Sequence, residues 1–129
     1  GLPQSDERAR STDAGAMKWR LVYLESPFAG DVDRNLHYAR ICMADCLARG
    51  DAPFVSHALY TQPDVLDDDI PDERTRGMSA GFAWADVAEV SVFYTDLGIS
   101  KGMQQGIEHA ERAGRTIEYR TLGTDWRIE

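Results

Sequence analysis

The chain has few of the residues that build nucleic-acid surfaces. It contains 14 lysine or arginine residues against 22 acidic residues, which gives a formal net charge of −8 over 129 residues. A sequence-independent grip on a nucleic-acid backbone depends on clustered basic side chains, so this composition argues against a DNA or RNA polymer as the partner. A free nucleotide remains compatible with it, because one helix N-terminus can hold a phosphate whatever the net charge.

Long apolar runs are also missing. No segment approaches the roughly 18 apolar residues that a membrane span needs, and no signal-peptide pattern is present. We therefore expect a soluble, cytoplasmic protein that does not interact with membranes.

Cysteine and histidine are too sparse and too scattered for a disulfide framework or a metal cage. The 2 cysteines, Cys42 and Cys46, lie four residues apart on a predicted helix, and the 3 histidines are far apart in the sequence. We expect no metal and interpret the two thiols as ordinary packed side chains of a reducing compartment. The acidic run over residues 64–73 lacks the register of a calcium loop and is interpreted as a solvated loop or mobile lid.

Periodicity after the first residues predicts one domain of alternating strands and helices. Residues 1–16 have no periodicity and are interpreted as a disordered leader or an expression remnant, and residues 17–129 as one α/β domain. The patterns predict strands over residues 19–24, 54–60, 90–94 and 116–122, and helices over 32–49, 72–87 and 101–113. This alternation predicts a flavodoxin- or Rossmann-like three-layer sandwich with a mainly parallel sheet of four to five strands.

The most informative stretch covers residues 90–113, where a β-branched strand leads through small residues into a helix. Ligands of open α/β sheets bind at the carboxyl ends of the strands, where helix N-termini offer free N–H groups. Asp96 and Ser100 are candidates to hydrogen-bond sugar hydroxyls, while Gly98 and Gly102 allow close backbone approach. The alternative is that Asp96 and Gly98 only form a turn.

Two further segments are expected at the same edge of the sheet. After the first strand, Ser26 and the turn at Gly30 are candidates for phosphate or sugar binding, with Asn35 in the first turns of the following helix; the alternative is that Asp31 or Asp33 only caps that helix. After the second predicted strand, His57 and Tyr60 offer side chains that stack on a base or hydrogen-bond to it. A structural role for this histidine is the alternative.

Four motifs, taken in order and spacing, resemble those of a known family. They are residues 22–28, residues 53–57, Trp84 together with Glu89, and residues 98–103. Together they resemble the nucleoside 2-deoxyribosyltransferase-like family, and most of all its small branch of phage- and bacteria-encoded members. The resemblance covers nearly all of residues 18–122.

The resemblance implies a protein that binds a nucleoside, a nucleoside monophosphate or a related small molecule and needs no cofactor. Family enzymes cleave the N-glycosidic bond with a glutamate nucleophile, and their chains usually associate, so a homodimer or larger homo-oligomer is expected. In this reaction, a carboxylate on one face of the sugar stabilises the oxocarbenium-like centre, and a proton donor near the leaving base assists its departure. The expected ligand contacts are Tyr23, Ser26, Pro27, Phe28, Gly30, Asp31, Asn35, His57, Tyr60, Gly98, Ile99, Ser100, Gly102 and Met103.

The chain departs from the family pattern at both acidic positions. Gly106 stands where the pattern places the nucleophile, and Gly81 stands where it places a second acid. Asp96 and Glu25 are the substitute catalytic candidates, since Glu108 lies about 200° around the helix from position 106. The function therefore stays open between an N-glycosidic hydrolase or deoxyribosyltransferase-like enzyme, a catalytically silent nucleotide-binding sensor or sponge, and a protein-interaction domain.

Overall fold

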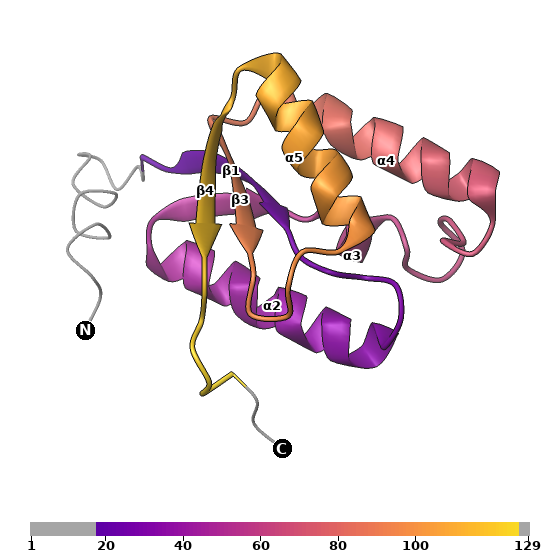
Figure 1. The fold of residues 1–129 in the computed structure, drawn as a ribbon, viewed down its shortest axis with the longest axis horizontal. Helices are drawn as coiled ribbons and strands as arrows, with labels where there is room; N and C mark the ends of the chain where they lie inside the picture. The colour runs from indigo at the N-terminus through magenta and orange to yellow at the C-terminus, as the bar shows by residue number, and fades with distance from the viewer. Residues whose placement is uncertain (1–17, 127–129) are drawn as a thin grey trace.

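The computed structural model describes residues 18–126, so the predicted leader lies outside the described residues. Four parallel strands form one sheet in the order β2-β1-β3-β4. Helix α2 covers one face, and helices α4 and α5 cover the other (Figure 1). This Rossmann- or flavodoxin-like arrangement confirms the predicted fold class. The elements are β1 (Arg20–Glu25), α2 (Val32–Ala48), β2 (Asp51–Phe54), α3 (Ser56–Leu59), α4 (Pro71–Ala85), β3 (Val90–Tyr94), α5 (Lys101–Ala113) and β4 (Thr116–Arg120).

The two central strands divide their side chains between two different environments. On the α2 side, Val22 and Leu24 of β1 join Val92 of β3 in the main hydrophobic core. On the opposite side, Tyr23 faces α4 and Glu25 faces α5, because alternate residues of a strand point to opposite faces. A carboxyl group is thus carried by a central strand into the layer between the sheet and its helices.

Helix α5 has a start signal, a stop signal and a narrow buried stripe. The Ser100 hydroxyl accepts the backbone N–H of Met103 at 3.2 Å, and the helix ends at Gly114 in the left-handed conformation with φ 69°. Its buried residues recur at helical spacing and include Gly106. These signals explain why the sequence predicted residues 101–113 without error at either end.

The predicted strand over residues 54–60 is wrong. The strand β2 ends at Phe54, and Ser56–Leu59 forms the short helix α3. Pro53 lies within β2, which is tolerated because, among residues 18–126, β2 is an edge strand that pairs with β1 alone. The start of β2 is fixed by Asp51, whose carboxylate contacts Arg20 at 3.1 Å and Arg120 at 2.8 Å.

The helix α2 packs both cysteines into the main core. Cys42 and Cys46 are free, fully buried thiols on the stripe that faces the sheet. The Asp31 carboxylate caps the helix by accepting the N–H of Arg34 at 3.2 Å.

Within residues 18–126, no helix combines the length and the apolar character needed to cross a bilayer.

Candidate functional site

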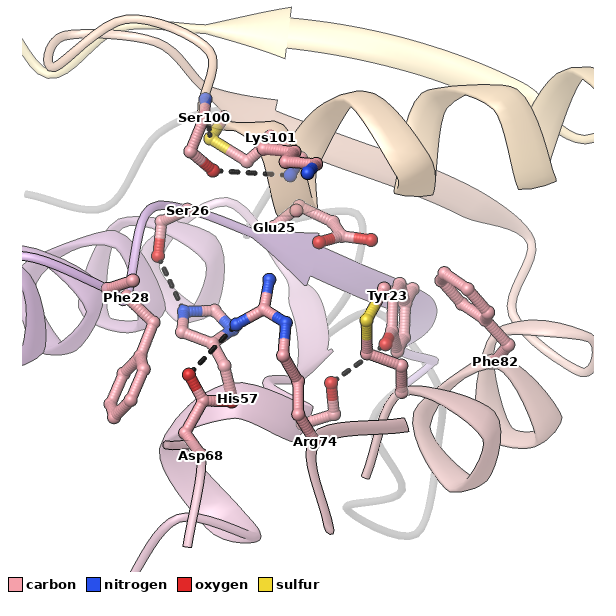
Figure 2. Close-up of a pocket in the computed structure, with 15 residues that line it drawn as sticks. Tyr23, Glu25, Ser26, Phe28, His57, Asp68, Arg74, Phe82, Ser100 and Lys101 are labelled. Carbon is pink, nitrogen blue, oxygen red and sulfur yellow. Dashed lines mark hydrogen bonds and ion pairs between the residues drawn. The ribbon is translucent and has the colours of Figure 1, made fainter. Parts of the chain in front are cut away.

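A cavity of about 140 Å³ opens at the carboxyl end of β1, between the sheet and helices α3, α4 and α5 (Figure 2). Its lining mixes aromatic rings, hydroxyl groups and charged side chains from segments far apart in the sequence. The lining residues are Tyr23, Glu25, Ser26, Phe28, Ala29, Ser56, His57, Asp68, Arg74, Met78, Phe82, Ser100, Lys101, Gly102 and Met103.

Glu25 brings an unpaired carboxyl group into this cavity. Within residues 18–126, its carboxyl oxygens form no hydrogen bond and no ion pair, in contrast to most other acidic groups around the sheet. Burial raises the pKa of Glu25 to about 8, and the positive charge of Arg115 lowers it by a smaller amount. The group is therefore mostly protonated at pH 7 and can donate a proton to a bound molecule.

Gly106 makes the room that this carboxyl group occupies. A Cβ built on Gly106 would overlap Glu25 Oε2 and lie 2.7 Å from Glu25 Cδ. The space that a side chain at position 106 of α5 would fill is thus occupied by the Glu25 side chain of β1. The position where the sequence lacks the expected acid holds a carboxyl group all the same.

Gly81 makes room for a hydroxyl pair in the same way. Tyr23 Oη lies 2.8 Å from Ser56 Oγ, and a Cβ on Gly81 would lie 2.5 Å from the first and 2.7 Å from the second. Burial raises the pKa of Tyr23, so the phenol stays protonated. Gly106 and Gly81 therefore both face polar side chains of β1.

His57 is held as a neutral imidazole on the opposite wall. Its Nε2 lies 2.9 Å from Ser26 Oγ, and its ring packs edge-on against Phe28 with centroids 6.3 Å apart. Burial lowers the pKa of His57 to about 4, which keeps the ring uncharged at neutral pH. The Ser26 and His57 pair can exchange donor and acceptor roles toward a ligand.

Positive charge is confined to the mouth of the cavity. Arg74 of α4 donates from Nη1 to Asp68 Oδ2 at 2.9 Å, and Lys101 begins α5 with its side chain exposed (Figure 2). A Cβ on Gly102 would lie 3.5 Å from Arg74 Nη2, so this guanidinium lies beside the first turn of α5.

Asp96, a predicted catalytic residue, does not line the cavity. Its carboxylate accepts hydrogen bonds from Tyr38 Oη at 2.5 Å, from the N–H of Leu122 at 2.9 Å and from the N–H of Gly123 at 3.1 Å. These bonds tie the end of β3 to α2 and to the segment after β4. The position explains Asp96 as a structural acceptor, and nothing in it supports contact with a sugar.

The structure brings together about half of the predicted site residues. Those that line the cavity are Tyr23, Glu25, Ser26, Phe28, His57, Ser100, Gly102 and Met103. The remaining predicted residues do not line it: Pro27, Gly30, Asp31, Asn35, Tyr60, Asp96, Gly98 and Ile99. Asn35 supports the site indirectly, because its amide donates to the carbonyl of Phe28 at 2.8 Å. Tyr60 lines a smaller neighbouring cavity.

Sequence reasoning missed the contribution of α4 and the preceding loop. Asp68, Arg74, Met78 and Phe82 line the cavity, whereas the acidic run was interpreted as a solvated loop or mobile lid and none of these residues was a predicted contact. One local signal was available: Arg74 lies in the first turns of a helix, where the dipole favours acidic residues. Within the described chain, no group of three histidine, cysteine or acidic side chains is placed to hold a metal ion.

Fold and cavity together define a parallel α/β protein with a polar, partly aromatic cavity at the carboxyl end of its central strands. The chain belongs to the family described as a domain of unknown function, DUF7768, whose model matches residues 20–120. No curated protein and no solved structure matches the chain.

Proposed function

We propose that this protein binds a nucleoside or nucleotide and hydrolyses its N-glycosidic bond, with Glu25 as the catalytic residue. The observation that carries the proposal is the unpaired Glu25 carboxyl group, which lines the cavity and occupies the space that a side chain on residue 106 would fill. The resemblance to nucleoside 2-deoxyribosyltransferase-like proteins adds support, because that pattern expects a carboxyl group at this position of α5.

The protonation state of Glu25 suits the breaking of a bond to a nitrogen base. As the C–N bond breaks, its electron pair goes to the base, and Glu25 gives its proton to the base nitrogen. A water molecule then adds its oxygen to the anomeric carbon and returns a proton to the Glu25 carboxylate. Atoms and charges balance without a metal or an organic cofactor.

The cavity walls suit a flat, partly apolar ring. Phe28 and Phe82 line opposite parts of the cavity, and Tyr23 lies near Phe82 with ring centroids 6.4 Å apart. The ring of Phe82 is fixed by His109, which stacks on it at 4.2 Å and 8°. Aromatic side chains held in this way provide stacking surfaces for a nucleobase.

A second candidate function is nucleotide binding without turnover. The other acidic side chain of the cavity, Asp68, is paired with Arg74, and Asp96 is occupied by backbone and phenol donors. Among the cavity-lining residues, Glu25 is thus the one carboxyl group without a partner, whereas glycosidases generally use two. A nucleotide sensor or sponge would need the cavity but not this chemistry.

The test is the release of free base from a panel of nucleosides and nucleoside 5′-monophosphates, read by chromatography. We expect release by the wild type, at least about 100-fold slower release by Glu25→Gln, and no change in Glu108→Gln. Glu108 is a matched control because it is exposed on α5, does not line the cavity and accepts a hydrogen bond from Gln104 of the same helix. Equal rates in the wild type and Glu25→Gln would contradict the proposal.

A thermal-shift assay with the same panel separates the two candidates. Stabilisation by nucleotides without base release would support the binding protein, because ligand binding raises stability whether or not a reaction follows. If the panel neither stabilises the protein nor releases free base, both candidate functions are contradicted.

We also propose that the chain self-associates, because chains of the nucleoside 2-deoxyribosyltransferase-like family that it resembles usually associate. The exposed apolar side chains Trp84 and Val87, which are 53% and 63% exposed, offer a surface that a second copy can cover. Equilibrium sedimentation at micromolar concentration should then give a species larger than the 14.4 kDa chain, and a single monomeric species would contradict this part.

A further inference from the structure

Arg74 is the side chain that links the acidic loop to the N-terminus of α5. Its guanidinium binds Asp68 at 2.9 Å on one side and reaches within 3.5 Å of a Cβ built on Gly102 on the other. The side chains of Arg74 and Asp68 are 34% and 21% exposed, so both lie at the cavity mouth and not deep within it. Figure 2 shows the guanidinium between Asp68 and Glu25, below Lys101.

The donors of Arg74 are only partly used. Within the described part of the chain, its side-chain hydrogen bonds run from Nη1 alone, although a guanidinium carries five N–H donors in a planar fork. Lys101 adds a second positive charge at the same rim of the cavity. An arginine in this state has the geometry to bind a tetrahedral anion through two donors.

Asp68 is held in place by a loop that does not depend on Arg74. The N–H of Asp67 donates to Glu73 Oε1 at 2.7 Å, and the N–H of Asp69 donates to Asp67 Oδ1 at 2.9 Å. The carboxylate of Asp68 can therefore leave the guanidinium while the backbone on either side keeps its bonds. The ion pair is a contact between two partly exposed groups, which is weak enough to exchange.

We propose that Arg74 determines specificity by binding the phosphate of a nucleoside monophosphate, and that Asp68 occupies Arg74 until this phosphate replaces it. The inference rests on the proposed function and names the substrate class of the same site. Exchange of one anion for another keeps Arg74 paired at every stage, so the guanidinium is never left without a counter-charge. Arg74 thereby favours ligands that bring their own anionic group, while Asp68 competes with that group and lowers its affinity; unphosphorylated nucleosides leave the ion pair intact.

The test compares ligand affinities by calorimetry for nucleosides, their 5′-monophosphates and inorganic phosphate. Arg74→Gln should weaken binding of the monophosphates at least about tenfold more than it weakens binding of the nucleosides. Asp68→Asn should tighten binding of the monophosphates about threefold or more relative to the nucleosides, because it removes the internal competitor for the phosphate.

Two variants control for charge alone. Arg76→Gln removes an exposed cation from the same helix, and Asp69→Asn removes an exposed acid from the same loop; neither residue lines the cavity. Both should bind every ligand as the wild type does. Equal effects of Asp69→Asn and Asp68→Asn would overturn the exchange, since they would reduce it to a change in net charge.

The outcomes separate this inference from the proposed function. If nucleosides and monophosphates bind equally well to the wild type and to Arg74→Gln, the inference fails and the nucleoside site stands. If inorganic phosphate shows the full effect of both variants and the nucleosides do not bind, the site takes free phosphate and both proposals fail. If the wild type binds no member of the panel, both fail as well.

Discussion

Glu25 and Asp96 are two acidic side chains at the carboxyl ends of the neighbouring parallel strands β1 and β3, yet their surroundings differ completely. Asp96 accepts hydrogen bonds from Tyr38 and from two backbone N–H groups. Glu25 accepts none within residues 18–126, and burial raises its pKa to about 8. A carboxylate that is fully bonded holds a fold together, whereas an unbonded carboxyl group that faces a cavity remains available to a ligand.

The largest expected effect is the contrast between the two amide substitutions. Asp96→Asn should lower the free energy of unfolding by about 3 kcal/mol, because an amide NH₂ would face backbone N–H groups that now donate to a carboxylate. Glu25→Gln should instead raise the free energy of unfolding at pH 7, because it removes a group that stays protonated in the folded state and ionises in the unfolded chain above pH 4.5. Urea denaturation of both variants measures the difference, and similar losses in both would remove the distinction.

The contrast also explains how far the sequence alone could go. Apolar periodicity predicted β1, β3, α2 and α5 closely, because each has one buried face and clear end signals. The strand β2 was missed because Asp51 and Pro53 do not fit a strand pattern, and long-range ion pairs to Arg20 and Arg120 hold it in place. Such contacts leave no local trace.

The same limit applies to the site. The sequence singled out Glu25 as a substitute acid and Gly106 as a glycine where the resembled pattern places the nucleophile, but only the fold shows that Glu25 occupies the space over Gly106. Arg74 and Asp68 lie in a segment whose composition indicates solvent exposure. Their meeting at the cavity depends on how α4 packs, which no pattern within residues 64–74 encodes.

The second largest expected effect is a change of about 2 kcal/mol in the free energy of unfolding with pH. A raised carboxyl pKa means that the folded state keeps a proton that the unfolded chain loses above pH 4.5, so Glu25 makes stability fall between pH 4.5 and 8. His57 acts in the opposite direction, because its lowered pKa makes stability fall as pH drops from 6.5 to 4. The two contributions offset each other between pH 4.5 and 6.5 and leave Glu25 alone above pH 6.5.

Stability should therefore decline by at most about 1.4 kcal/mol per pH unit from pH 6.5 to 8. Glu25→Gln should flatten this decline, and Glu108→Gln should retain it. Denaturation curves at intervals across this range provide the measurement. A decline of equal slope in the wild type and in Glu25→Gln would mean that Glu25 ionises normally.

The smallest expected effects distinguish the two glycines that face β1. Gly81→Ala should cost about 1–2 kcal/mol of stability, because the new Cβ would lie 2.7 Å from Ser56 Cβ, which cannot move without α3. Gly106→Ala meets only the end of the flexible Glu25 side chain, so it should shift the carboxyl group and slow base release about tenfold with little change in stability. Unfolding and turnover measured on both variants check this. A loss of stability in Gly106→Ala together with slower base release only in Gly81→Ala would contradict the placement of Glu25 over Gly106.

The most direct test of the account is a carbon-13 NMR titration of the Glu25 side-chain carboxyl, assigned by comparison with Glu25→Gln. The account predicts a midpoint near pH 8 in the free protein, and a displaced midpoint when a nucleoside monophosphate is bound, because the ligand would contact this group. A midpoint near 4.5 that no nucleoside or nucleotide changes would show that Glu25 is an ordinary solvated acid and would contradict the central claim.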